Sequence, residues 1–434
     1  MRSGLLLEGV RPLGGPRQRI LIKEGRIAEV GEHVGDRAAV RVDCTDLVAL
    51  PALVDLHTHL RQPGGEHAET VASGTRAAAA GGYGAVVAMA NTDPVADSVA
   101  VVEEVAHAAA GAACAVLPAG AVTRGLGGEA LADIRGMAAS RAAVRVFSDD
   151  GRCVHHSALM RDALRQIAAV GGVLAQHAED PLLTVGAQVN DGRIADLTRL
   201  PGWPAAAEES IIARDCVLAA HEGARLHVCH VSTAGAVEVL RWAKARGIAV
   251  TAEVTPHHLL LTDDLALTGD PLYKVNPPLR APEDVAALRR ALAEGIIDAV
   301  ATDHAPHAAA DKTPPWCGAR PGMLGLETAL AVVAETLVET EAMGWADVAD
   351  RMAVRPAHIA GAGRRFGRPL QRGEPASLVL IQRLPWQVRP ADSLSLSRNV
   401  PYSGRSFTHR PVLTMLDGRI THDHHGLLNG AGPT

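Results

Sequence analysis

Residues 53–61 read LVDLHTHLR, a short apolar run that ends in His57 and His59. Side chains two residues apart point to the same face of a strand, whereas on a helix they diverge. The stretch therefore predicts a strand with two imidazoles side by side at its end. A lone histidine in a chain with 20 of them is usually an ordinary core or surface residue, so a metal site needs support from elsewhere in the sequence.

Three further stretches end in residues that bind metals: QHAE at 176–179, HVCHVS at 227–232 and ATDHAPH at 301–307. They supply His177, His230 and the carboxylate of Asp303. Imidazole nitrogens combined with carboxylate oxygens are the donor set of hydrolytic zinc sites. The four stretches together predict a metal-dependent hydrolase.

Apolar runs rich in Val, Ile, Leu and Ala recur along the chain, and each is followed by a longer segment of helical periodicity, as in a parallel sheet built from strand–helix units. The eight runs are 53–57, 83–89, 113–122, 143–147, 172–176, 224–229, 249–254 and 297–301. Polar residues follow them, among them Asn91, Asp149-Asp150 and His257-His258. Because active sites of (β/α)8 barrels lie at the C-terminal ends of the strands, we predict an α/β fold with a (β/α)8 TIM barrel over residues 51–364.

The two ends of the chain, residues 1–50 and 365–434, have a different pattern of short strands and turns. The strand-like runs are 5–9, 19–25, 40–43, 376–381 and 412–418. The dipeptide Asp417-Gly418 is typical of a hairpin turn. We expect the two ends to pair into one small β-sandwich domain beside the barrel.

Composition agrees with this organisation. A chain of 434 residues is long enough for one barrel and a small domain. A net charge of −6 without a basic stripe argues against nucleic acid as a partner. No apolar run is long enough to cross a membrane, and the first one is interrupted at Glu8 before a signal-peptide core forms, so we expect a cytoplasmic protein.

The six cysteines show no CxxC spacing, which favours buried apolar side chains in a reducing compartment. Cys229 stands beside His230, but adjacent residues of a strand face opposite sides. We therefore do not expect Cys229 to bind the metal.

Several longer motifs have a specific combination of residues. They are DLHTHLRQPG at 55–64, ANT at 90–92, FSDDG at 147–151, HAE at 177–179, EVTPHH at 253–258, KVNPPLR at 274–280 and ATDHAPH at 301–307. With these motifs the chain resembles the long bacterial dihydroorotases of the amidohydrolase superfamily, from near residue 1 to near residue 420. The resemblance implies zinc-dependent, reversible closure of N-carbamoyl-L-aspartate to L-dihydroorotate in pyrimidine synthesis.

The resemblance also implies a role for each site residue. Two zinc ions per chain are implied, with His57 and His59 at the first, His177 and His230 at the second, and Asp150 as the bridge. Asp303 would complete the first site and carry the proton in catalysis.

Substrate-binding residues follow from chemistry and resemblance together. The planar guanidinium of Arg61 suits the substrate carboxylate, which it can bind with two parallel hydrogen bonds. The resemblance adds Asn91, Asn276, His307 and the main chain of Pro321 and Gly322. It leaves a homodimer and an association with aspartate transcarbamoylase open.

The bridging residue separates this chain from many barrel amidohydrolases, which use a carbamylated lysine. Residues 146–151 read VFSDDG, without lysine. The resemblance favours Asp150, 27 residues before His177, as the bridge. Asp149 remains the alternative, with a capping or supporting role as its other interpretation.

Three other functions stay open from the sequence. Allantoinases and hydantoinases share the fold and the histidines but generally use the bridging lysine. A metal-free scaffold for aspartate transcarbamoylase would have lost ligands, whereas every ligand position is filled here. An adenosine-type deaminase shares the ligands but gives no reason for Arg61 and Asn276.

Overall fold

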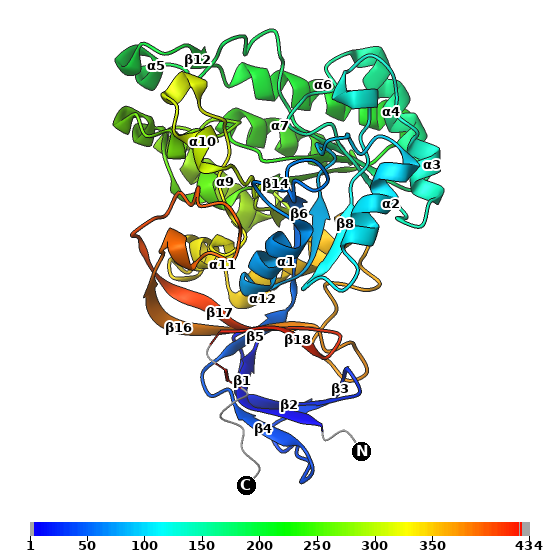
Figure 1. Ribbon diagram of the computed structural model, residues 1–434, viewed down its shortest axis with the longest axis vertical. Helices are drawn as coiled ribbons and strands as arrows, with labels where there is room; N and C mark the ends of the chain where they lie inside the picture. The colour runs from blue at the N-terminus through cyan, green and yellow to red at the C-terminus, as the bar shows by residue number, and fades with distance from the viewer. Residues whose placement is uncertain (1–3, 425, 428–434) are drawn as a thin grey trace.

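The computed structural model describes residues 4–424, 426 and 427. It contains a group of parallel strands surrounded by helices, with a separate sheet beneath it (Figure 1). Residues 1–3, 425 and 428–434, which the sequence analysis assigned to the small domain, lie outside the described residues. Among the residues that are described, no helix is long and apolar enough to cross a membrane.

Eight short strands form two parallel groups, with the orders β6-β7-β8 and β9-β10-β13-β14-β15. Their bounds are β6 (Leu53–Thr58), β7 (Tyr83–Ala88), β8 (Ala115–Pro118), β9 (Val146–Phe147), β10 (Val173–Gln176), β13 (Leu226–Val228), β14 (Val250–Val254) and β15 (Ala299–Val300). Isolated parallel bridges join Gly120 to Phe147 and Thr58 to His304, so the pairing returns from the last strand to the first. Each strand overlaps one of the eight apolar runs, which confirms their predicted positions.

The apolar composition of these strands follows from their burial. Every residue of β6 and β7 is buried, as in parallel strands covered on both faces. Leu56, Val87, Val146, Val173 and Ala299, from the strands β6, β7, β9, β10 and β15, belong to one apolar cluster. The strand ends are therefore held at fixed positions relative to one another.

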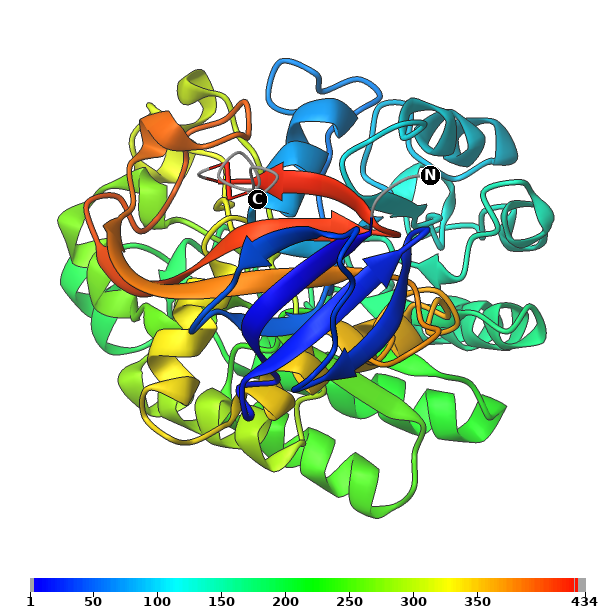
Figure 2. The ribbon, with the colours of Figure 1, turned by 90° about the horizontal axis from the view of Figure 1, so that it is seen from below.

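Helices follow the strands and lie around the outside of the parallel group (Figure 2). They are α1 (Val71–Ala80), α2 (Val99–Ala108), α3 (Ile134–Ala139), α4 (Ser157–Ala169), α6 (Ala206–Glu222), α7 (Ala234–Ala245), α8 (Pro256–Leu260), α9 (Pro282–Glu294), α11 (Ala329–Val333), α12 (Trp345–Ala349) and α13 (Arg355–Ile359), with π-helical turns η5 (Ala334–Val338) and η6 (Asp350–Val354). Several begin at a threonine whose hydroxyl accepts a main-chain N–H, as Thr70, Thr233 and Thr255 do.

The loops carry shorter elements. These are η1 (Arg124–Leu126), β11 (Val189–Asn190), α5 (Arg193–Thr198), β12 (Gly202–Trp203), η2 (Asp263–Thr268), η3 (Pro271–Tyr273), α10 (Ala309–Lys312), η4 (Trp316–Gly318) and η7 (Pro390–Asp392). The segment from Ala308 to Met323 contains α10 and η4.

The remaining strands form one continuous sheet from both ends of the chain, in the order β18-β17-β16-β5-β1-β2-β3 with β4 paired to β1. The strands are β1 (Leu5–Pro12), β2 (Gln18–Lys23), β3 (Arg26–Gly31), β4 (Val40–Asp43), β5 (Val48–Pro51), β16 (Leu378–Gln387), β17 (Ser406–Leu416) and β18 (Arg419–Asp423). Their inward side chains, from Leu7 and Ile20 to Leu380 and Met415, share one core. Strands from the two ends of the chain lie in one sheet because β16 pairs antiparallel with β5.

The sequence analysis missed part of this sheet. It named no run for β3, β5 or β18, and it ended the run in β16 at Ile381, whereas the strand continues to Gln387. The second half of β16 is largely exposed, so no apolar pattern marks it. The hairpin at Asp417 and Gly418 is confirmed, since both residues have positive φ and join β17 to β18.

Candidate metal centre

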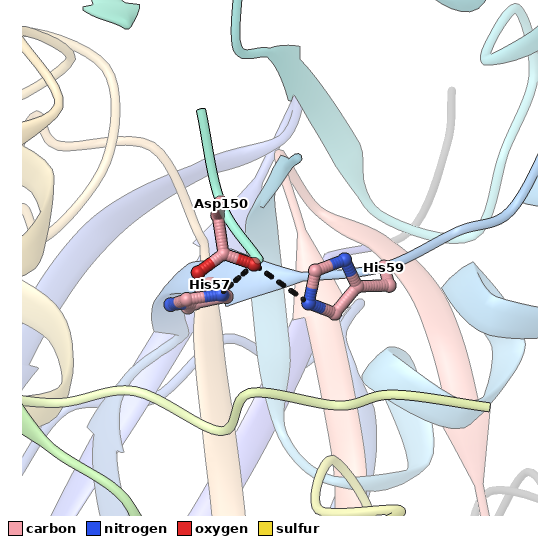
Figure 3. A group of neighbouring side chains, drawn as sticks. All are labelled: His57, His59 and Asp150. Atoms are coloured by element: carbon pink, nitrogen blue, oxygen red, sulfur yellow. Dashed lines mark ion pairs between the residues drawn. The ribbon is translucent and has the colours of Figure 1, made fainter. Parts of the chain in front are cut away.

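Four imidazoles surround the carboxylate of Asp150. One oxygen, Oδ2, lies 3.2 Å from His57 Nε2 and 3.3 Å from His59 Nε2 (Figure 3). The other, Oδ1, lies 3.2 Å from His177 Nδ1 and 3.3 Å from His230 Nε2. The two oxygens of one buried side chain thus each face a separate pair of nitrogens, and both sets meet the geometry of a metal-binding group.

The strand ends position these groups. His57 is the fifth residue of β6, and Asp150, His177, His230 and Asp303 stand one to three residues after β9, β10, β13 and β15. His230 and Asp303 have positive φ values of 33° and 43°. Such a backbone is strained for residues other than glycine and recurs at functional sites.

Asp303 joins the same cluster. Its Oδ1 lies 3.1 Å from His59 Nε2 and 3.5 Å from His57 Nε2. Burial opposes ionisation of both aspartates, but the histidines, His57 foremost, hold the pKa of Asp150 well below its ordinary value and also lower that of Asp303. Both side chains are therefore carboxylates at neutral pH.

Hydrogen bonds on the far side of three imidazoles fix their orientation. His57 Nδ1 lies 2.9 Å from Glu253 Oε1, His59 Nδ1 donates to Asn91 Oδ1 at 2.8 Å, and His177 Nε2 lies 2.9 Å from Glu179 Oε2. Metal-binding histidines commonly donate their second ring N–H to a carboxylate or carbonyl in this way. Each imidazole consequently presents its other nitrogen to Asp150.

The neighbouring Asp149 has different partners. Its Oδ1 accepts hydrogen bonds from the main-chain N–H groups of Val122 and Thr123 at 2.7 and 2.9 Å, and the Thr123 hydroxyl donates to Oδ2. Asp149 therefore fastens the loop after β8 and does not face the imidazoles.

Cys229 lies closer to the cluster than alternation along the strand suggests. Its Sγ, His57 and Glu253 have ligand atoms within 4.8 Å of one another. Burial raises the pKa of the Cys229 thiol to about 12, so the thiol is protonated at neutral pH. Glu253 is already bonded to His57 and to His227, at 2.9 Å each.

The residues predicted to bind substrate lie on the loops that follow β6, β7, β14 and β15. Arg61 Nε donates to the Pro306 carbonyl at 3.1 Å, and His307 Nε2 donates to the Pro321 carbonyl at 2.7 Å. The N–H of Gly322 donates to the Lys274 carbonyl at 2.9 Å, which brings the segment that carries Asn276 beside Gly322. Asn91 reaches the cluster through His59, as described above.

His257 is a further buried imidazole near the cluster, at the start of α8. Burial lowers its pKa to about 4, with smaller effects from Asp303, His230 and His57. Its Nε2 has no hydrogen-bond partner among the described residues. The sequence placed His257 after a strand but predicted no role for it.

Comparison with known proteins agrees with the motifs. A family model described as dihydro-orotase-like matches residues 46–236. The dihydroorotase of Streptomyces coelicolor is 55% identical over 96% of this chain and 98% of its own length, and that of Mycobacterium tuberculosis is 51% identical over 96% and 98%. The chain belongs to the dihydroorotase family.

Solved structures of related enzymes have the same overall fold as this dihydroorotase-family chain. An L-hydantoinase (dihydropyrimidinase) from Arthrobacter aurescens has a TM-score of 0.86 at 25% identity and covers 97% of this chain and 96% of its own. A dihydropyrimidinase from Brevibacillus agri has a TM-score of 0.84 at 19% identity over 97% and 95%. At that identity the second similarity shows the fold alone.

Sequence reasoning missed the residues that support this dihydroorotase-family site. Glu179 stands two residues after His177, just beyond the end of β10, and this short spacing between an imidazole and a carboxylate was a usable signal. Glu253 lay in a quoted motif without a role. Asn399, far away in the sequence, contacts the loop after β15 and had no signal at all.

Proposed function

We propose that the chain is a zinc-dependent dihydroorotase that reversibly closes N-carbamoyl-L-aspartate to L-dihydroorotate in pyrimidine synthesis. One observation carries the proposal: the two oxygens of Asp150 face two separate pairs of imidazoles at 3.2–3.3 Å. A carboxylate between two such pairs can bridge two cations without a carbamylated lysine. The identity of the relatives supports the choice of substrate.

The donor set fits two zinc ions. His57, His59 and Asp303 would hold one, His177 and His230 the other, with Asp150 as the bridge. The buried Nε2 of His57 makes no well-aligned hydrogen bond among the described residues, and it faces Asp150 Oδ2 at 3.2 Å and Asp303 Oδ1 at 3.5 Å. The atom is therefore placed as a zinc ligand would be, beside the two carboxylates that complete the donor set. When bound, zinc supplies polarisation of the scissile carbonyl and activation of water.

Asp303 is the proton carrier in this proposal. It is an ionised carboxylate within 3.1 Å of His59 Nε2, beside the place where water would react. In ring opening it accepts the proton of the attacking water and delivers it to the ring nitrogen as the carbon–nitrogen bond breaks. In the closing direction it carries a proton from the carbamoyl nitrogen to the departing oxygen.

Arg61 would bind the substrate carboxylate, and His307 the ring. Burial, assisted by Arg61, lowers the pKa of His307 to about 3, so the imidazole is neutral. Because its Nε2–H donates to the Pro321 carbonyl, Nδ1 is left as an acceptor for an N–H of the substrate. Asn91, Asn276 and the main chain of Pro321 and Gly322 remain predicted contacts.

We further propose that the ring of eight parallel strands is a (β/α)8 barrel over residues 51–364, and that residues 1–50 and 365–434 form a small β-sandwich domain. The bridges at Gly120 and Thr58 support the closed ring. A homodimer, an association with aspartate transcarbamoylase and a cytoplasmic location stay predictions.

The test combines metal analysis with substrate comparison. We expect purified protein to contain about two zinc ions per chain and to open dihydroorotate in preference to allantoin, hydantoin and dihydrouracil. Asp303→Ala should lower single-turnover ring opening by a factor on the order of 10³ or more, the scale of a lost general acid–base group. Activity within tenfold of wild type would remove Asp303 from this role. Protein without metal and without activity would instead be a scaffold.

A second candidate is another cyclic-amide hydrolase. The similarity of the fold to the L-hydantoinase over 97% of this chain favours it. The sequence VFSDDG at the end of β9, without lysine, argues against it. Preference for hydantoin over dihydroorotate in the same assay would favour this candidate.

A further inference from the structure

Residues 393–399, which read SLSLSRN, connect β16 to β17 and contact two loops that follow parallel strands. We call them the 393–399 segment. Ser395 Oγ donates to Glu69, the main-chain N–H of Leu396 donates to Glu69 Oε1 at 3.2 Å, and Ser397 Oγ donates to the Ala68 carbonyl at 2.7 Å. This half of the segment is thereby attached to the loop after β6, which contains Arg61.

The other half ends in Asn399, whose buried amide contacts the loop after β15. Its Nδ2 donates to the carbonyls of Ala305 and Gly322 at 2.9 and 3.1 Å, and its Oδ1 accepts the N–H of His307 at 3.2 Å. The Asn399 carbonyl accepts the N–H of Leu324 at 3.0 Å. One side chain therefore holds the start and the end of the 305–322 loop together.

The groups between these contacts are those predicted to bind the substrate. Pro306 lies between Ala305 and His307, which both bond to the Asn399 side chain. Its carbonyl accepts the hydrogen bond from Arg61 Nε at 3.1 Å. His307 in turn donates to the Pro321 carbonyl, directly before Gly322. Displacement of Ala305 or Gly322 would thus move Arg61, His307 and the Gly322 main chain together.

We propose that Asn399 is a positioning residue that sets the geometry of the carboxylate-binding part of the substrate site, an inference that rests on the proposed function for the identity of the ligand. Only an amide of this length fits, because the position requires two N–H donors and one acceptor on a single side chain. Aspartate has the same shape but would bring an oxygen against two carbonyl oxygens. Asn399 itself does not need to touch the substrate.

The test compares Asn399→Asp with Ser397→Ala, a control in the same segment that loses one hydrogen bond but does not contact the 305–322 loop. For Asn399→Asp we expect the KM for dihydroorotate to rise on the order of tenfold, ~1.4 kcal/mol. The kcat should stay within about threefold, because the metal ligands and Asp303 are unchanged. Ser397→Ala should leave both constants near wild type. Hydrogen exchange of residues 304–324 should become faster only in the Asn399 variant.

Two results would overturn the inference. One is an Asn399→Asp enzyme with wild-type KM and wild-type exchange over 304–324. The other is an equal rise in KM in both variants, which would make the whole segment a general support. If the aspartate variant does not fold, Asn399→Ala, which adds no charge, replaces it with the same expectations. Should wild type not act on dihydroorotate at all, the proposed function fails, and the exchange measurement alone decides whether Asn399 holds the loop.

Discussion

Asp149 and Asp150 are neighbours in the chain, yet their carboxylates contact different groups. Asp150 lies among four imidazole nitrogens, whereas Asp149 accepts hydrogen bonds from Val122 and Thr123. In the proposed two-zinc site, removing the charge of Asp150 would leave the two dications unscreened from each other. We expect Asp150→Asn to lose at least one zinc per chain and nearly all activity, measured by metal analysis and ring-opening rate.

Asp149→Asn serves as the matched control. This variant should keep its zinc. We expect it to be destabilised by about 1–3 kcal/mol, because one carboxylate oxygen that accepts hydrogen bonds from Val122 or Thr123 is replaced by an NH2 group that cannot accept them. The reverse pattern of metal loss would transfer the bridging role to Asp149. Reconstitution of the apoenzyme with zinc in buffer free of carbon dioxide should restore full activity, and a requirement for bicarbonate would exclude a carboxylate bridge.

Arg61 is the residue proposed to bind the substrate carboxylate, and this role can be tested separately from metal binding. Its side chain is partly buried, its guanidinium is attracted by the charges of Asp303 and Asp150, and its Nε donates to the Pro306 carbonyl. Arg61→Met keeps much of the side-chain length but removes the charge. We expect its KM to rise by a factor on the order of 10² for dihydroorotate, the range of a lost charged hydrogen bond, and much less for dihydrouracil, which has no carboxylate. Equal effects on both substrates would make Arg61 a structural residue.

At the scale of elements, the C-terminal end of α1 lies against Leu326, in the segment between β15 and α11. Gly81 caps this helix with φ −80°, a conformation open to any residue, and alanine would ordinarily be preferred there. A Cβ at Gly81 would, however, lie 2.0 Å from the Leu326 carbonyl oxygen. We expect the clash to dominate and Gly81→Ala to destabilise the protein by about 1–3 kcal/mol in urea unfolding. Gly35→Ala, where a Cβ meets nothing within 4 Å, should be nearly neutral.

At the scale of the whole molecule, buried neutral histidines couple stability to pH. The imidazole of His257 has a pKa of about 4 in the folded protein against its ordinary value of 6.5. Between these values the unfolded chain binds the extra proton, so the free energy of unfolding falls as pH is lowered from 6.5 towards 4. His257 contributes up to about 1.4 kcal/mol per pH unit to this loss.

His257→Gln removes that contribution. Urea midpoints of metal-free protein at pH 7 and pH 5 should therefore fall less in the variant than in wild type, by an amount that matches the one titrating group. Parallel loss in both proteins would mean that His257 is already protonated or solvated in the folded state.

The local sequence was sufficient for much of the fold and for the identity of the cluster. Strands buried on both faces must be apolar along their whole length, so the eight runs were visible without any tertiary information. Exposed strands such as the second half of β16 have no such requirement and were missed. Positions at strand ends follow directly from the strands, which is why His57, His59, His177 and His230 could be predicted together.

What the sequence determined by itself is therefore which imidazoles and carboxylates stand at the strand ends and the order of those strands along the chain, because both depend on residues a few positions apart. The tertiary structure decided which oxygen of Asp150 faces which pair of imidazoles, that Glu253 orients His57, and that Asn399 holds the loop after β15. Asn399 lies 94 residues from Ala305 and Glu253 lies 196 residues from His57. Contacts over such separations leave no local pattern, and they form only when the folded strands bring distant loops together.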